Sequence, residues 1–184
     1  MKTELEKMRS EELYSFADPE VYASYMQADR ACQRLNATCL SDVDYRPALE
    51  ALLPGIPTSA MVVPPFFCDH AHGITLGEHV FINRQVTMLN SGRITIGAHT
   101  LIGPNCSFYT PEHPFDYLER RQPVETGYPI TIGEDCWLGG NVIVVGGVTI
   151  GPRSVIGAGS VVVKDIPADT LAVGNPCRPI RKLR

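Results

Sequence analysis

An apolar residue returns every six positions through much of this chain, a period that fits neither a helical stripe nor an alternating strand. The clearest run holds Ile132, Leu138, Val144, Ile150, Ile156 and Val162. An earlier, interrupted run holds Leu76, Ile82, Met88, Ile96 and Ile102. Such a repeat is typical of a parallel β-helix, in which each hexad gives one short strand and a turn and three hexads close a coil. We therefore expect the aliphatic residue to point inward and the glycines beside it to allow tight turning.

The composition limits the partners of this chain. Its 184 residues are 44% apolar, enough for one core, and 16 basic against 20 acidic residues give a net charge of −4. That balance argues against a nucleic acid or an anionic membrane as partner. No apolar run approaches the roughly 20 residues of a membrane span, and the first residues are charged, unlike a signal peptide. We expect a cytoplasmic protein whose six cysteines are free thiols.

Residues 1–57 are expected to form a helical segment that packs on the β-helix. Thr3 and Glu6 have the spacing of a capping box, and Asp18 before Pro19 predicts the start of a longer helix. A third helix is expected near 45–53. These helices would cover the open end of the coil.

Residues 58–184 are expected to form the β-helix itself. The hexads are interrupted between Tyr109 and Pro129, which predicts an inserted loop over 109–129 at a corner of the coil. The chain is expected to leave the coil at about 166–169 and to end in a basic tail.

His113 lies in this loop between two prolines, where its backbone is restrained and its imidazole can accept a proton at neutral pH. It is a candidate general base, although a loop histidine is often only a surface residue. Glu112, Asp116 and Glu125 could each orient the ring, and the sequence does not choose among them.

Other residues could bind ligands. Trp137 precedes an inward aliphatic residue and should face outward, either as a contact between subunits or as a wall for the pantetheine arm of a cofactor. Gly139 and Gly140 offer backbone N–H groups without side-chain cover. The candidates for contact with a phosphorylated ligand are Lys164, Arg178 and Arg181. The candidates for contact with a hydroxylated substrate are Asp18, Asp69 and Asn83, of which Asp18 has a competing role as helix cap.

The chain resembles the hexapeptide-repeat acyltransferases, and more narrowly the maltose and galactoside O-acetyltransferases. The resemblance covers nearly the whole chain. It is carried by Met8–Tyr14, Pro65–Asp69, His113–Pro114, Trp137–Gly139, Gly157–Ser160, Lys164–Pro167 and Gly174–Pro176. The acceptor half departs more from the family pattern than the cofactor half does, since the corner at Asn90 and Ser91 lacks an acid and His70 replaces a tyrosine.

The resemblance implies a left-handed β-helix and a homotrimer with active sites between subunits. It further implies that His113 is the general base and that Asp18, Asp69 and Asn83 hold the acceptor. Acetyl-CoA, as co-substrate, would lie along Trp137, Gly140, Ala158 and Lys164, with its phosphates near Arg178 and Arg181.

We therefore interpret the chain as an acetyl-CoA-dependent O-acetyltransferase that acts on a hydroxyl of a sugar such as maltose, glucose or a galactoside. Alternatives are another small acceptor (an amino sugar, serine or an antibiotic) and a non-catalytic trimeric scaffold. The five histidines also raise the possibility of a metal site between subunits, as in a metal-dependent hydratase. No grouping of histidine and carboxylate at ligand spacing supports that reading, so no metal is expected.

Overall fold

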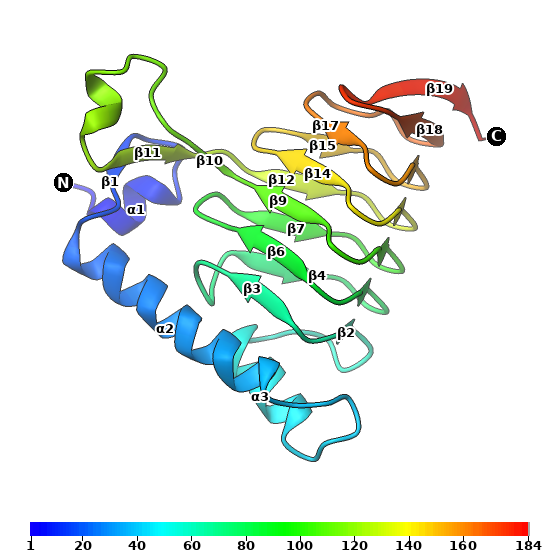
Figure 1. Cartoon of the computed structure of the whole chain (residues 1–184), viewed down its shortest axis with the longest axis horizontal. Coiled ribbons are helices and arrows are strands. Elements are labelled where there is room, and N and C mark those ends of the chain that lie inside the picture. The colour runs from blue at the N-terminus through cyan, green and yellow to red at the C-terminus, as the bar shows by residue number, and fades with distance from the viewer. Residues whose placement is uncertain (184) are drawn as a thin grey trace.

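The computed structural model describes residues 1–183, and its strands wind into a left-handed parallel β-helix (Figure 1). The helices lie at and along the N-terminal end of the coil, and a hairpin lies at the C-terminal end. The predicted fold class is thereby confirmed.

Each full coil contributes one strand to each of three parallel sheets. We name these sheets faces 1, 2 and 3, in the order in which the chain forms them from Ile74 onward. Face 1 holds β4 (Ile74–Leu76), β7 (Ile94–Ile96), β12 (Ile130–Ile132) and β15 (Thr149–Ile150). Face 2 holds β2 (Met61–Val62), β5 (Phe81–Ile82), β8 (Leu101–Ile102), β13 (Trp137–Leu138), β16 (Val155–Ile156) and β18 (Thr170–Val173). Face 3 holds β3 (Phe66–Cys68), β6 (Val86–Leu89), β9 (Ser107–Tyr109), β14 (Ile143–Val145) and β17 (Val161–Val162).

The periodic aliphatic residues fill the interior, as predicted. All six members of the run from Ile132 to Val162 are buried, in one cluster that continues through the earlier run. Burial of a side chain of this kind stabilises the fold by about 1.5–3 kcal/mol. The coil therefore owes its stability to one column of interior side chains along its length.

The hexad glycines have a different role from the one expected. The left-handed backbone conformation at the corners falls two residues later, mostly on residues other than glycine, such as Asp135 with φ of 55° and Asn141 with φ of 59°. A Cβ on Gly133 would instead lie 2.5 Å from the backbone nitrogen of Pro152 in the next coil. Glycine there permits the close stacking of coils rather than the turn.

The N-terminal helices follow the predicted capping signals. The capping box of Thr3 and Glu6 begins α1 (Glu4–Met8), and the Asp18 side chain caps α2 (Pro19–Asn36). The third helix, α3 (Tyr45–Leu52), buries Leu49 and Leu52 in the same cluster as the first strands of the coil. It lies at the N-terminal end of the coil (Figure 1).

The C-terminal segment differs from the expectation that the chain leaves the coil at 166–169. Ile166 still bridges to Ile150, and β18 continues face 2 in parallel with β16. Then β19 (Arg178–Lys182) folds back antiparallel on β18. The basic residues expected in a tail therefore form a terminal strand.

The inserted loop contains β10 (Pro111–Glu112), the 3-10 turn η1 (Glu119–Arg121) and β11 (Val124–Gly127). It pairs with the N-terminal strand β1 (Tyr14–Ser15) in a small antiparallel sheet of order β1-β11-β10. Through this sheet the N-terminal segment reaches the loop that carries His113.

Candidate active site

His113 follows β10 directly, at the corner where face 3 turns toward face 1. Its Nδ1 lies 3.2 Å from the carbonyl oxygen of Val124 across the hairpin. Its ring stands edge-on to Phe16, with centroids 5.9 Å apart. The ring is 51% exposed, so these two contacts orient it while leaving it accessible.

Glu125 is the acidic residue that the structure places beside His113. Its Oε2 lies 3.8 Å from His113 Nε2, and its carboxylate is only 12% exposed. Tyr14 donates its hydroxyl to Oε1, and the Ser91 hydroxyl donates to the same oxygen at 2.8 Å. Asp116 is not in this group, because its carboxylate accepts from the backbone N–H groups of Leu118 and Glu119.

The Tyr14 hydroxyl is a permanent donor to this carboxylate. Burial first, and the charge of Glu125 second, raise the pKa of Tyr14 far above its usual value. The phenol therefore stays protonated at any pH at which the protein is active.

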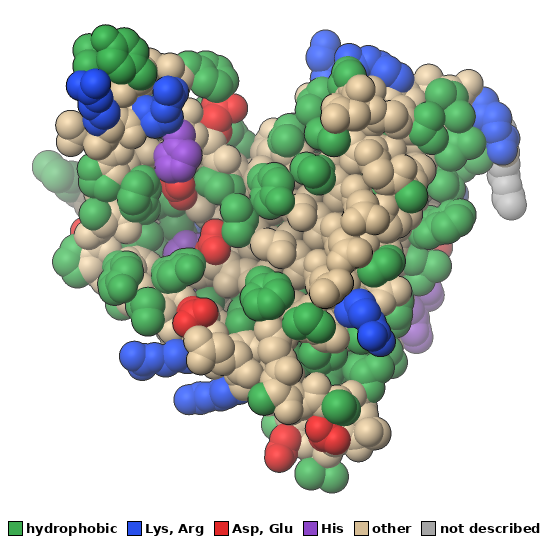
Figure 2. Space-filling model, viewed as in Figure 1, with side chains coloured by type: hydrophobic (Ala, Val, Ile, Leu, Met, Phe, Trp, Pro, Cys, Tyr) green, Lys and Arg blue, Asp and Glu red, His purple; other side chains and the backbone are tan. Residues whose placement is uncertain are grey.

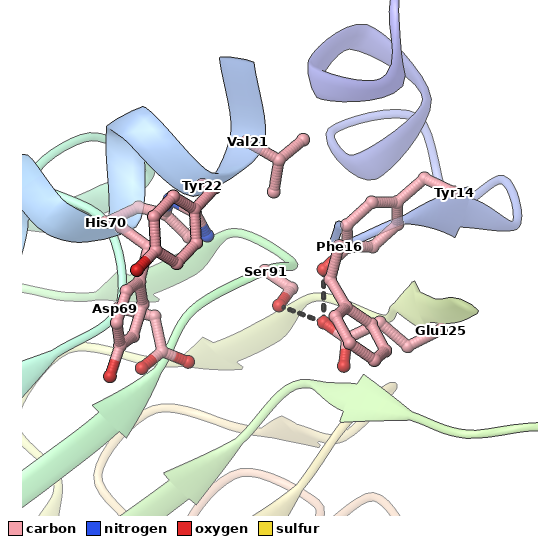
Figure 3. Close-up of a pocket in the computed structure, with 9 residues that line it drawn as sticks. Tyr14, Phe16, Val21, Tyr22, Asp69, His70, Ser91 and Glu125 are labelled. Atoms are coloured by element: carbon pink, nitrogen blue, oxygen red, sulfur yellow. Dashed lines mark hydrogen bonds between the residues drawn. The ribbon is translucent and has the colours of Figure 1, made fainter. Parts of the chain in front are cut away.

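A cavity of about 260 Å³ opens beside Glu125 (Figure 3). It is lined by Tyr14, Phe16, Val21, Tyr22, Tyr25, Asp69, His70, Ser91 and Glu125. The lining combines aromatic rings with a few polar groups, a mixture typical of sites for small ligands. We name it the acceptor pocket, because it contains Asp69, one of the residues that the resemblance leads us to expect at the acceptor.

Asp69 belongs to this pocket, at the end of face 3. Burial, and to a smaller extent the charge of Glu125, raise the pKa of Asp69 to about 6. Asp69 and Glu125 therefore share the pocket, and ionisation of Asp69 costs free energy.

Asp18 and Asn83 do not line the pocket. Asp18 Oδ1 accepts from the backbone N–H of Glu20 at 2.9 Å and of Val21 at 3.4 Å, which confirms its role as helix cap. Asn83 lies at the corner between faces 2 and 3, where its Oδ1 accepts from the N–H of Arg84.

The residues expected to bind acetyl-CoA are spread over face 2 and its surroundings. Trp137 faces outward and is 56% exposed. On neighbouring strands of the same sheet, Val155, Leu171 and Arg181 follow it in register. Gly139, Gly140 and Ala158 lie at the corner between faces 2 and 3. Lys164 follows face 3 at its other edge, and Arg178 is exposed on the terminal strand.

The expected residues therefore fall on opposite edges of face 3. His113, Asp69 and Lys164 are on the edge toward face 1, whereas Asn83 and the glycine pair are on the edge toward face 2. Figure 2 shows an open notch between the loop that carries η1 and the C-terminal hairpin. A single chain does not bring the two groups together.

Residues 1–183 hold no group of three or more His, Cys, Asp or Glu side chains that could bind a metal ion. None of the helices within that range is long and apolar enough to cross a membrane.

Several pocket residues carried no signal in the sequence. Tyr14, Tyr22 and Tyr25 were not candidates, because their approach depends on the pairing of β1 with β11 and on the packing of α2. Two other pocket residues did carry a signal: the resemblance singled out the corner at Asn90 and Ser91 for lacking an acid, and His70 for replacing a tyrosine.

Comparison with known proteins identifies the class to which this fold and site belong. Residues 129–164 match the family model described as bacterial transferase hexapeptide (six repeats). Residues 7–53 match the maltose acetyltransferase hexapeptide capping motif. The chain is 43% identical over 183 residues to a Staphylococcus aureus protein provisionally named an acetyltransferase, covering 98% of this chain and 92% of that protein. The chain thus belongs to the hexapeptide-repeat acetyltransferases.

Similar solved structures show which type of hexapeptide-repeat acetyltransferase this chain is. A hexapeptide-repeat acetyltransferase from Vibrio cholerae, in complex with acetyl coenzyme A, is 42% identical with a TM-score of 0.92, covering 100% of both chains. A maltose O-acetyltransferase from Clostridium difficile is 37% identical with a TM-score of 0.96, covering 100% of this chain and 98% of that one. A galactoside acetyltransferase in complex with coenzyme A is 30% identical with a TM-score of 0.94, covering 100% of this chain and 92% of that one. This chain is an acetyltransferase of the maltose and galactoside O-acetyltransferase type.

Proposed function

We propose that the protein transfers the acetyl group of acetyl-CoA to a hydroxyl group of a sugar such as maltose, glucose or a galactoside, with His113 as general base. The observation that carries this proposal is that His113 Nε2 lies 3.8 Å from the carboxylate of Glu125, a residue that lines the aromatic pocket. The named substrates of the maltose and galactoside relatives support the choice of a sugar.

The contacts of His113 suit the role of a base. Its Nδ1–H donates to the Val124 carbonyl, so the lone pair of the neutral ring lies on Nε2. In the proposed reaction Nε2 takes the proton of the acceptor hydroxyl as its oxygen bonds to the thioester carbon. The C–S bond of the resulting tetrahedral intermediate then breaks, and the thiolate leaves with the proton from the imidazolium. Glu125 stabilises the imidazolium that exists between these two proton transfers.

The oxyanion needs a backbone donor near the thioester. The N–H of Gly139 already donates to the carbonyl of Ile156 at 2.8 Å. We therefore assign the oxyanion to the N–H of Gly140, at the corner where an added Cβ would meet Pro104 at 3.3 Å.

The proposal includes a homotrimer with its active sites between subunits. His113 and Gly140 lie on opposite edges of face 3 in one chain, so the base of one subunit must meet the glycine corner of another. Met61, Leu101 and Trp137 form an exposed apolar column on face 2, which supports association through that face.

Acetyl-CoA is assigned to the residues expected from the sequence. Its pantetheine arm would pass Trp137, Gly140, Ala158 and Lys164, and its phosphates would contact Arg178 and Arg181. The exposed β19 strand, which carries both arginines, supports this assignment. The ligands named for the Vibrio and galactoside relatives, acetyl-CoA and coenzyme A, are of the same chemistry.

The acceptor is assigned to Asp69, Asp18 and Asn83. Asp69 lines the pocket directly. Both capping contacts of Asp18 use Oδ1, which leaves Oδ2 for a hydroxyl. Asn83 would be supplied by the neighbouring subunit.

The test is acetyl-CoA-dependent thiol release with glucose, maltose, galactosides, amino sugars and serine. Release with neutral sugars and not with serine is the expected result. Release only with an amino sugar or serine would overturn the sugar hydroxyl as acceptor. Calorimetry with acetyl-CoA alone tests the cofactor separately from the acceptor. If the protein binds acetyl-CoA but acetylates none of these compounds, acetyl-CoA binding is supported and the sugar acceptor is wrong.

A further inference from the structure

The half-buried guanidinium of Arg9 begins a network of hydrogen bonds that leads to His70, a residue of the acceptor pocket. Arg9 Nη1 donates to the carbonyl oxygens of Asn90 at 2.6 Å and Ser91 at 2.9 Å. Arg9 Nη2 donates to the carbonyl of His72 at 2.7 Å and lies 2.8 Å from Nδ1 of the same histidine. Burial, more than the nearby charge of Arg93, lowers the pKa of Arg9 to about 10, so the group stays charged at neutral pH.

Arg9 fixes which group donates and which accepts in each hydrogen bond of this network. A guanidinium only donates, so His72 Nδ1 accepts and its proton is on Nε2. His72 Nε2 then donates to the Ser24 hydroxyl at 3.0 Å. Ser24 in turn donates to His70 Nδ1 at 2.8 Å, which leaves the proton of the His70 ring on Nε2.

His70 is the last residue of this hydrogen-bond network, and it lies at the surface of the pocket. The residue is only 3% exposed, yet it lines the cavity (Figure 3). Nδ1 is used by Ser24, and among residues 1–183 Nε2 has no hydrogen-bond partner. Burial first, and then the charges of Arg9 and His72, lower the pKa of His70 to about 3. The ring is therefore neutral, with one N–H whose partner must come from the cavity.

We propose that His70 is a specificity-determining residue of the acceptor pocket, a fixed Nε2–H donor that recognises an oxygen atom of the acceptor. Arg9, His72 and Ser24 are positioning residues that set its tautomer. This inference rests on the acceptor pocket of the proposed function and names the chemistry that the pocket selects.

The pocket then offers both kinds of hydrogen-bonding group. Asp69 and Glu125 accept, and His70 donates. A neutral hydroxyl can satisfy both, because it donates one bond and accepts another. A protonated amine has no lone pair, so an ammonium opposite His70 cannot accept a hydrogen bond from the Nε2–H. The arrangement therefore favours a neutral sugar over the corresponding amino sugar at that position.

The first experiment reads the tautomer without any turnover. Long-range proton–nitrogen correlation spectra of the full-length protein distinguish a protonated ring nitrogen from an unprotonated one. We expect the His70 proton on Nε2 in the wild type and a mixture of tautomers in Ser24→Ala. Ser10→Ala is the matched control, because the Ser10 hydroxyl donates to the Glu6 carbonyl on α1 and its loss should leave the His70 signals unchanged. A wild-type ring protonated at Nδ1 would overturn the proposal.

The second experiment reads the selectivity. Thiol release is measured with glucose, its monodeoxy analogues and glucosamine for the wild type, His70→Leu and His70→Gln. In the wild type, loss of one hydroxyl should lower kcat/KM by about tenfold, because the Nε2–H of His70 loses its hydrogen-bond partner on the acceptor. His70→Leu should lower kcat/KM for glucose by a similar factor and should not distinguish that deoxy analogue from glucose.

His70→Gln is the rescue variant, because its side-chain amide can place an N–H near the position of Nε2. We expect it to recover most of the discrimination that His70→Leu loses. Equal discrimination by the wild type and His70→Leu at every ring position would overturn the role of His70. If the wild type releases no thiol with any sugar, the proposed acceptor is wrong and the donor loses its assigned partner, whereas the spectra still decide the tautomer.

Discussion

The Glu125 carboxylate lies 3.8 Å from Nε2 of His113, and hydroxyl groups from two distant parts of the chain hold it there. Tyr14 comes from the N-terminal strand β1, and Ser91 from the corner after β6. Glu125 itself lies on β11, in the insertion. The site therefore depends on three segments that meet only in the folded chain.

Glu125→Gln should lower kcat while leaving the acceptor KM within a few-fold. Glutamine can still accept from Tyr14 and Ser91, so the variant removes the charge and keeps the geometry. An ion pair with a partner as exposed as His113 contributes up to about 1 kcal/mol, so we expect roughly a fivefold loss of kcat. Glu112→Gln, on the paired strand β10, is the matched control. Equal losses in the two variants would contradict the special role of Glu125.

Asp69 should make the protein less stable as the pH rises. Its pKa is about 6 in the folded protein against 3.8 for an unperturbed aspartate, so the folded state holds the proton more tightly. The stabilisation from this proton is complete below about pH 4 and is lost as the pH rises through 6. Asp69→Asn should therefore be more stable than the wild type by about 2–3 kcal/mol at pH 7.5, with the difference vanishing near pH 4.

Urea unfolding at a fixed protomer concentration measures this difference, since an oligomer's stability depends on concentration. A difference between Asp69→Asn and the wild type that is the same at pH 4 and pH 7.5 would show that the carboxyl titrates normally.

Mixed oligomers should test whether each site is shared between subunits. His113→Ala and Asn83→Ala homotrimers are both expected to be impaired. After the two are unfolded together and refolded in equal amounts, one site in four pairs an intact His113 with an intact Asn83 from the neighbour. Activity should therefore recover to about a quarter of the wild-type value. A mixture with only the mean activity of the two variants would place both residues in one subunit's site.

Replacing Arg178 and Arg181 together by alanine should raise the KM for acetyl-CoA. Loss of two charge-assisted contacts to phosphate from exposed side chains should cost about tenfold, with the acceptor KM nearly unaltered. Arg30→Ala with Arg34→Ala, on α2, is the control pair. Equal changes in both KM values would point to a role of β19 in assembly.

The coil could be predicted from the sequence because its signal is local. Each hexad gives the same turn and buries the same kind of residue, so the period from Ile132 to Val162 specifies the stacking without any knowledge of distant contacts. The helix starts at Thr3 and Asp18 were predictable for the same reason, since a cap needs only its own next few residues.

The acceptor pocket was not predictable in this way. Tyr14 and Glu125 are 111 positions apart, and no pattern in either segment indicates that β1 joins the hairpin of the insertion. His70 adjoins Asp69 in the sequence, but its role depends on tertiary packing. Ser24 contacts His70, and Arg9 contacts His72, only in the folded chain. The final coil and the β18–β19 hairpin were missed because that segment departs from the hexad pattern.

The central claim is that His113 is the base of acetyl transfer, and the kinetics of His113→Ala test it most directly. With acetyl-CoA and maltose, the variant should lose about 10²–10⁴ in kcat, the usual contribution of a general base. Its affinity for acetyl-CoA, measured by calorimetry, should equal that of the wild type. His99→Asn is the control, because His99 lies at the corner between faces 1 and 2 and asparagine tolerates its left-handed backbone. An unchanged kcat in His113→Ala would contradict the account.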